Sequence, residues 1–318
     1  MTSRRPRAFT EYFGLAGVLA ILVAVFAATT DHFLTGLTFT TLANQIPALT
    51  VVAVGLTLVL IAGGIYLSVG SVLSLGSAVL AMALVEWRLP PPLAIALCLT
   101  VGLFAGLING FVTVRWAVPS FIVTVGMLEA ARGTAYLVTG SRSVFVGGSI
   151  AALGTPLSGL GLSPAFLVAV LMVVAGQLVL TRTVFGRSLV AIGTNAEAVR
   201  LSGIDPRPVV AAVFGVSGAL AGLGGVFHLA YLESADPNSG IGLELAAIAA
   251  VVIGGTSLMG GRGSVVSSFL GVLIIAVLQS GLAQVGATEP AKRIVTGVVI
   301  VVAVILDAWR LASHRAEA

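Results

Sequence analysis

The residues that could carry out catalysis or bind a metal are few and scattered. The three histidines, His32, His228 and His314, lie far apart and have no carboxylate or cysteine at the spacing of metal ligands. No serine lies in the pattern of a nucleophile elbow. Cys98, the single cysteine, lies in an apolar run and is expected to be a small core residue. The sequence therefore predicts no metal site, no catalytic residue and no enzyme activity.

A glycine-rich segment, GGTSLMGGRGS from Gly254 to Ser264, invites comparison with a phosphate-binding loop. Such a loop needs Gly-Lys-Ser/Thr at its end, but here Arg262 follows the glycine pair and no strand precedes the segment. We therefore expect no nucleotide to bind here. Glycines also allow helices to approach closely or the backbone to turn sharply. We expect that role for the glycines of this segment and of a similar earlier pair: Gly63, Gly64, Gly254, Gly255, Gly260 and Gly261.

A polar interval, GRSLVAIGTNAEAVRLSGI from Gly186 to Ile204, separates two apolar runs and contains signals for a short helix. Asn195 can accept hydrogen bonds from the free N–H groups of a first helical turn. Glu197 suits the positive end of the helix dipole and lies three residues before Arg200, so the two can pair. Gly203 can take the left-handed conformation that ends a helix. The pattern predicts about two turns of helix, and an ordinary solvated loop is the alternative.

The composition indicates that these segments belong to a membrane protein. The chain is 58% hydrophobic and 9% charged, with a mean hydropathy of +1.13, whereas a globular domain is about 25% charged. About 20 apolar residues are needed to cross about 30 Å of hydrocarbon. Ten ranges fit: 13–30, 46–64, 67–85, 93–114, 118–139, 164–181, 208–232, 244–258, 264–284 and 291–309. Gly63, Gly64, Gly254 and Gly255 break up the apolar runs near the third and the eighth, where discontinuous helices are expected. The first resembles a signal peptide but lacks a convincing cleavage site, so we expect a retained helix.

The basic residues predict the orientation of these spans. With a cytoplasmic N-terminus, eleven arginines fall inside: Arg4, Arg5, Arg7, Arg115, Arg182, Arg187, Arg200, Arg207, Arg262, Arg310 and Arg315. Four basic residues fall outside: Arg88, Arg142, Lys292 and Arg293. The excess inside favours this arrangement, which places both termini and residues 182–207 in the cytoplasm. No basic cluster is interleaved with aromatic residues, so nucleic-acid binding is not expected.

Polar residues inside the spans are the candidates for a solute pathway, because each is costly in lipid unless it is paired or faces a cavity. Glu129 and Arg132 are three apart and can form a structural ion pair or serve transport. Four uncharged residues can line a path or bond across helices: Asn109, Thr124, Gln177 and Gln279. A proton- or sodium-driven carrier needs an embedded relay of acids, which a single carboxylate beside an arginine does not provide. We expect the energy for transport to come from another protein.

Four blocks of sequence carry a family resemblance. They are TLVLIAGGIYLSVGSVLSL (Thr57–Leu75), GLINGFVTVRWAVPSFIVTVGMLEAARG (Gly106–Gly133), GRSLVAIGTNAEAVRLSGI and PNSGIGLELAAIAAVVIGGTSLMGGRGSV (Pro237–Val265). Together they resemble the membrane-spanning subunit of ATP-binding-cassette (ABC) importers of the ribose-type sugar permease family, from about residue 44 to residue 310. One departure is Tyr66, where the family signature usually has an acid.

The resemblance implies partners as well as a fold. In that family two membrane subunits, two ATP-binding subunits and an external solute-binding protein form the importer, and ATP and Mg are bound by the ATPase rather than by the permease. The family's coupling helix, which docks in a cleft of the ATPase, carries over to the short predicted helix and its ends: Asn195, Glu197, Val199, Arg200, Leu201 and Gly203. The second permease is a copy of this chain or a related chain.

We therefore predict an all-α integral membrane protein with about ten transmembrane helices, some of them broken, similar to type II ABC importers. Cytoplasmic tails at 1–12 and 311–318 flank one transmembrane domain, 13–310, in a bacterial inner membrane. The expected function is import of a monosaccharide or related small polar solute, with Asn109, Thr124 and Glu129 as candidates for the path. A self-sufficient carrier or channel is the main alternative, and a polytopic membrane enzyme is a third.

Overall fold

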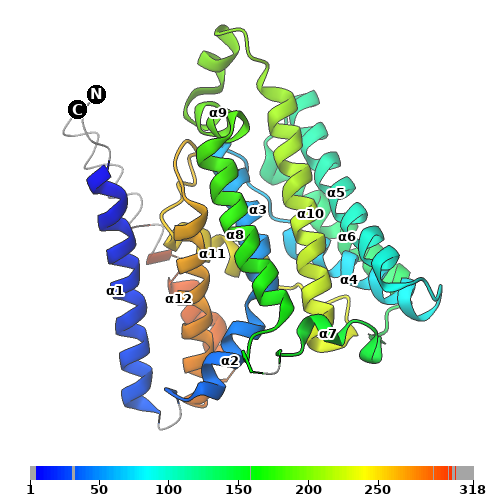
Figure 1. The fold of residues 1–318 in the computed structure, drawn as a ribbon. Helices are drawn as coiled ribbons and strands as arrows, with labels where there is room; N and C mark the ends of the chain where they lie inside the picture. The colour runs from blue at the N-terminus through cyan, green and yellow to red at the C-terminus, as the bar shows by residue number, and fades with distance from the viewer. Residues whose placement is uncertain are drawn as a thin grey trace.

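The structure, a computed structural model, describes residues 5–30, 33–157, 159–288, 290–299, 301, 302 and 305, with side chains from residue 12 onward. Within these residues the regular secondary structure is helical apart from one short antiparallel pair of strands, β1 (Val144–Phe145) and β2 (Ser234–Ala235). The helices are α1 (Arg5–Thr29), α2 (Gly36–Gln45), α3 (Pro47–Ile61), α4 (Val69–Val85), α5 (Pro91–Trp116), α6 (Ser120–Thr139), η1 (Gly147–Ser149), α7 (Ala151–Gly154), α8 (Pro164–Arg182), α9 (Val184–Leu201), α10 (Pro206–Leu232), α11 (Leu243–Ile253) and α12 (Val265–Gln284). The long helices run side by side as a bundle (Figure 1).

Nine of the ten expected ranges coincide with described helices. Six helices are long and apolar enough to cross a membrane, namely α5, α6, α8, α10, α12 and residues Tyr12–Thr29 of α1. The pair α2 and α3, bent by 48°, makes a possible seventh span. The third and eighth ranges correspond to α4 and to α11, which at 11 residues is about 16 Å long and too short to cross alone. The tenth, 291–309, lies partly outside the described residues. Residues 290–299 are described and are helical.

The core is built around α3, α4 and α10. Almost every residue of α3 and α4 is buried, because both helices are apolar all round and other helices enclose them. Glycines let α10 pack closely on α5: a Cβ built on Gly106 or on Gly218 would overlap a backbone carbonyl of the facing helix. Cys98 is buried at the same contact and donates from Sγ to the Gly222 carbonyl at 3.2 Å, which confirms its expected core position.

Two apolar helices end inside the bundle in the same way. After α3 the Gly64 N–H donates to the Val59 carbonyl at 3.0 Å, and after α11 the Thr256 N–H donates to the Val251 carbonyl at 3.2 Å. In each case the preceding glycine, Gly63 or Gly255, has φ near +80°, and the bond runs back five residues, as in a Schellman motif. The sequence similarity between the two glycine pairs therefore reflects a shared way of stopping a helix.

Candidate functional site

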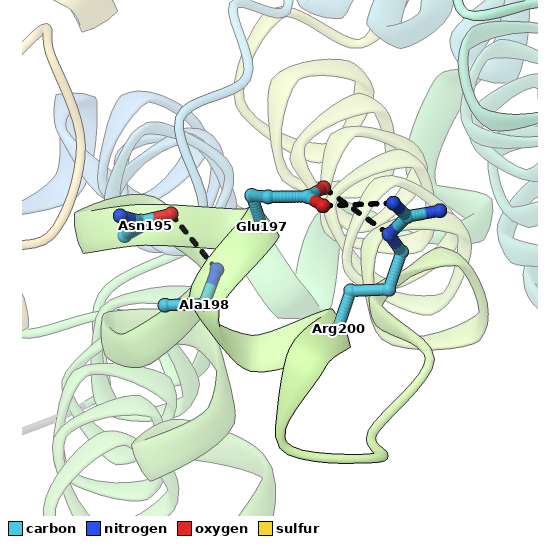
Figure 2. Close-up of polar contacts among 4 residues, drawn as sticks. All are labelled: Asn195, Glu197, Ala198 and Arg200. Carbon is cyan, nitrogen blue, oxygen red and sulfur yellow. Dashed lines mark hydrogen bonds and ion pairs between the residues drawn. The ribbon is translucent and has the colours of Figure 1, made fainter.

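The polar interval forms a helix that is broken in the middle. Within α9 the backbone of Asn195 is extended (φ −162°, ψ 95°), so two helical pieces meet at this residue. The Asn195 Oδ1 accepts a hydrogen bond from the Ala198 N–H at 2.9 Å (Figure 2). This is the N-cap interaction that the sequence predicts at Asn195.

The first turn after the cap contains the expected ion pair. The Arg200 guanidinium donates to both carboxylate oxygens of Glu197, at 2.7 and 3.1 Å (Figure 2). The hydrogen bond from Arg200 holds the pKa of the Glu197 carboxyl below its usual range. Both side chains are exposed, so solvent screens the pair and it adds little stability to the helix.

The second piece of helix ends at a glycine, as predicted. Gly203 has φ +88°, and its N–H donates to the Arg200 carbonyl at 3.0 Å. The Ile204 N–H donates to the Val199 carbonyl at 3.3 Å, which completes a Schellman motif. Residues 195–203, called here the capped segment, are therefore a short helix with a defined start and a defined end.

The capped segment lies outside the bundle. Figure 1 shows the end of α9 projecting beyond the other helices at the upper end of the molecule. Leu201 is 79% exposed and Ile204 51% exposed, and Val199 is half-buried. These apolar side chains lie next to the exposed Glu197–Arg200 pair. This end of the molecule therefore presents exposed apolar side chains together with charged ones.

The residues before the cap differ from our expectation, because 184–194 are helical rather than loop. The Thr183 Oγ1 accepts from the Gly186 N–H at 3.1 Å and starts this piece. Phe185, Leu189 and Ile192 face inward at helical spacing, and the last two are buried. The cap at Thr183 and this spacing are the signals that could have predicted the helix.

Two residues before Asn195, the backbone of α9 touches two other segments. The Gly261 N–H donates to the Ile61 carbonyl at 2.9 Å, joining the loop before α12 to the end of α3. A Cβ built on Gly193 would overlap that carbonyl and lie 2.5 Å from the Gly261 nitrogen. A Cβ built on Gly260 would lie 3.0 Å from the Gly63 Cα. We call these five residues the glycine junction: Ile61, Gly63, Gly193, Gly260 and Gly261.

The remaining candidate glycines have separate reasons to be glycine. A Cβ on Gly254 would lie 2.6 Å from the Ser267 carbonyl and the Ser268 Cα, so α11 and α12 approach closely there. A Cβ on Gly255 would meet nothing within 4 Å, and its φ of +80° is what favours glycine. A Cβ on Gly64 would lie 2.9 Å from the ring of Phe214.

The polar residues of the spans fall into two groups. Asn109 and Thr124 are fully buried and bond across helices: the Asn109 Nδ2 donates to the Ser68 Oγ at 3.2 Å, and Thr124 bonds to the backbone of the segment between α3 and α4. The Gln177 Oε1 accepts from the Val265 N–H at 2.9 Å at the start of α12. Glu129 differs, because it is 72% exposed and lies 3.7 Å from Arg132, which is 21% exposed.

Tyr66, the departure from the family signature, lies between α3 and α4. Its side chain is fully buried, with its ring 5.4 Å from that of Phe214. An acid of the usual signature would be much smaller than this ring, so the aromatic pair fills space here. Among the described residues, no group of three His, Cys, Asp or Glu side chains could hold a metal ion.

These observations define a class of protein: a multi-pass helical membrane protein with broken helices and an exposed capped helix at one end. A family model described as the permease component of branched-chain amino acid transport systems matches residues 38–304, and the chain belongs to this family. It is therefore a transport subunit and not an enzyme.

Relatives named for sugar import align with most of the chain. The chain is 36% identical to the ribose import permease protein RbsC of Escherichia coli over 91% of each chain. It is 37% identical to the ribose import permease protein of Bacillus subtilis, over 91% of this chain and 90% of the relative. It is 31% identical to the fructose import permease protein FrcC of Rhizobium meliloti, over 87% of this chain and 79% of the relative. No solved structure matches the chain. The family resemblance drawn from the four sequence blocks is confirmed.

Proposed function

We propose that this chain is the membrane subunit of an ATP-driven importer of a monosaccharide or a related polar solute, and that the capped segment binds the ATPase. The relatives named for ribose and fructose import support a sugar as the solute. The family description names amino acid transport. We favour a sugar because each ribose permease aligns over about nine-tenths of its own length and of this chain.

One observation carries the docking proposal: the exposed capped segment follows directly on the glycine junction. The junction joins the end of α3, the middle of α9 and the loop before α12 through backbone atoms with no side chain between them. A push on residues 195–203 therefore reaches the end of α3 and the loop before α12 without first compressing flexible side chains. Such an element can convert movement of a bound ATPase into movement of the transmembrane helices.

The residues of the capped segment have different proposed roles in binding the ATPase. Asn195 and Gly203 fix its two ends, and Val199 and Leu201 offer apolar contact to the partner. Glu197 and Arg200 form a charged rim beside these apolar residues. ATP and Mg would be bound by the ATPase, because nothing in the glycine-rich segment 254–264 has the sequence of a phosphate-binding loop.

The orientation that we propose places the capped segment and both termini in the cytoplasm, and the protein in a bacterial inner membrane. The excess of arginine on that side supports it. The described start of α1 also points to the end of the bundle where α9 lies (Figure 1). Residues 140–163 then face outward, where a solute-binding protein would deliver the solute. The tails remain 1–12 and 311–318, and the second tail lies outside the described residues.

The solute pathway is proposed to lie between two permease subunits. Asn109, Thr124 and Glu129 remain our candidates for it. The cross-helix bonds of Asn109 and Thr124 fit a role in holding the walls together, whereas Glu129 alone of the three has an exposed side chain.

Reconstitution tests the function directly. Vesicles that contain the permease, its ATPase and the solute-binding protein should accumulate ribose, fructose or another monosaccharide only when ATP is supplied. Uptake by the permease alone, without any ATPase, would instead identify a self-sufficient carrier or channel. Competition among sugars and branched-chain amino acids in the same vesicles would decide the solute class.

A further inference from the structure

One exposed face of α6 carries an ionisable side chain at a depth where contact with lipid requires apolar residues. It consists of Gly126, Glu129, Ala130, Gly133 and Thr134, all exposed, and is called here the α6 face. Glu129 is the tenth of the twenty residues of α6, so it lies about 15 Å from either end of the helix. That position is close to the middle of a bilayer about 30 Å thick.

The neighbouring helices show what a lipid-facing surface looks like in this protein. Between their terminal turns α5 and α8 expose no ionisable side chain, and most of their exposed side chains are large and apolar: Leu103, Phe104, Ile108 and Phe111 on α5, and Leu167, Leu171, Val174 and Leu178 on α8. Both helices have a mean hydropathy of 2.2, against 1.3 for α6. Apart from α1, α6 is the least buried of the six long helices and also the least apolar of all six. The exposed residues of α6 also include large apolar ones, Phe121, Ile122, Val125 and Leu137, so the feature that contact with lipid does not explain is the exposed Glu129 among them.

Arg132 does not remove this conflict. The Arg132 Nη1 lies 3.7 Å from the Glu129 Oε1, but the arginine is largely covered while the carboxylate is 72% exposed. The arginine therefore holds the carboxylate from one side and leaves its other side open. A Cβ built on Gly126 or on Gly133 would meet no atom within 4 Å, so no described part of the chain covers the helix around Glu129. An ionisable side chain at this depth needs water, a polar solute or a protein partner beside it.

We propose that the α6 face lines the solute pathway opposite the same face of a second copy of this chain, and that Glu129 accepts hydrogen bonds from the hydroxyl groups of the passing sugar. The proposal rests on the importer function and adds to it a recognition group. An ionised carboxylate is an acceptor at both oxygens, so it can bind two neighbouring hydroxyls of one sugar. In a two-fold arrangement the two copies of Glu129 would flank the pathway, and the small residues beside them leave room for the solute.

Water access at position 129 tests the proposal. Glu129→Cys is compared with Leu171→Cys in a Cys98→Ala background. Leu171 is a fair control because it is 58% exposed and lies in the middle of α8. A sulfonate-bearing methanethiosulfonate reagent is added to the assembled complex in vesicles. Position 129 should react with the reagent, and sugar uptake by that variant should stop. Position 171 should stay unmodified, because lipid excludes both the reagent and the thiolate. A bifunctional thiol reagent should join two copies through position 129 and not through position 171.

A conservative series separates recognition from folding. Glu129→Ala should lower the maximal uptake rate about 10- to 100-fold, the worth of hydrogen bonds to a charged group, and Glu129→Gln should lower it less. The half-saturating sugar concentration, set by the binding protein, and ATPase association should not change. If the complex assembles and transports but position 129 is inert to the reagent, or if Glu129→Ala transports normally, the pathway assignment is wrong and the importer function stands. A cross-link to a different chain overturns the second-copy arrangement. If the unsubstituted complex shows no ATP-dependent uptake, the proposed function itself fails.

Discussion

The ends of α3 and α9 share a backbone motif and differ in what surrounds them. Both have a glycine with positive φ, Gly63 or Gly203, followed by a hydrogen bond that runs back five residues. After α3 the chain is mostly buried although Gly63 itself is exposed, with Gly64 against the ring of Phe214 and the Ile61 carbonyl bonded to Gly261. After α9 the chain is uncovered, with Leu201 and Ile204 exposed.

The difference shows that the motif fixes where a helix stops, and the surroundings fix what that stop can do. An enclosed end with backbone contacts on several sides cannot take a ligand, but it can transmit a displacement. An uncovered end with apolar side chains can bind a partner. Gly193 and Asn195 lie two residues apart on α9, so this helix carries both kinds of surface.

The largest effect is expected at the enclosed side. Gly193→Ala would place a methyl group on the Ile61 carbonyl, and the backbone atoms around it cannot yield without separating α9 from α3. We expect a loss of stability of about 1–3 kcal/mol and loss of most ATP-dependent uptake. Thermal unfolding in detergent and vesicle uptake measure the two effects. Gly17→Ala is the matched control, since a Cβ there meets nothing within 4 Å, and it should leave both unchanged. Normal uptake by Gly193→Ala would show that the glycine junction transmits nothing.

A smaller effect is expected at the cap of the uncovered side. Asn195→Ala removes the acceptor of the Ala198 N–H and should cost about 0.5–2 kcal/mol of helix stability. Because the segment must be folded to dock, the affinity for the ATPase should fall by up to about 30-fold. Asn195→Asp keeps an acceptor and should retain most of the affinity. Titration of the ATPase onto the purified permease measures both. Equal affinities for Asn195→Ala and the unsubstituted protein would remove the cap from the docking account.

The smallest effect concerns the exposed ion pair. Arg200 lowers the pKa of Glu197 in the folded segment. The stability that the ion pair gives to the folded segment is therefore fully present above the unfolded pKa of Glu197, about 4.3. It is lost as the pH falls through the still lower folded pKa. Changing the pH from 7.5 to 5.5 should leave helix content in residues 195–203 unchanged, measured by hydrogen exchange. Glu197→Gln should reduce protection slightly, and less at high salt. Loss of protection between pH 7 and pH 5 would show that another group controls the segment.

The sequence could predict the local features of this site and not the contacts between distant segments. The start at Asn195, the Glu197–Arg200 pair and the end at Gly203 depend on residues within a few positions of one another, and their types indicate the structure directly. The glycine junction brings together residues 61, 193 and 261, which no local pattern connects. Gly193 was therefore not predicted as a packing glycine, although Gly63, Gly260 and Gly261 were.

The spans show the same division. Their apolar runs predicted where helices lie, because hydropathy is a property of each segment alone. Gly254 and Gly255 predicted a break at the eighth range, but how short α11 is was not predicted, because the close approach of α12 behind Gly254 is a contact between two helices. The exposure of Glu129 is visible only in the structure, because the sequence does not show that α6 buries Thr124 and exposes Glu129.

The most direct test of the docking account is retention of the ATPase by a permease with a reversed surface on the capped segment. Glu197→Arg with Leu201→Arg changes the charge and the apolar contact while leaving the Asn195 cap and Gly203 in place. Leu160→Arg is the control, an exposed leucine in the segment proposed to face outward. Co-purification and uptake per ATP hydrolysed are measured for both inserted, folded proteins. The account predicts that the control keeps its ATPase and that the double variant loses it or hydrolyses ATP without transport. A double variant that binds its ATPase and transports at the normal rate per ATP would contradict it.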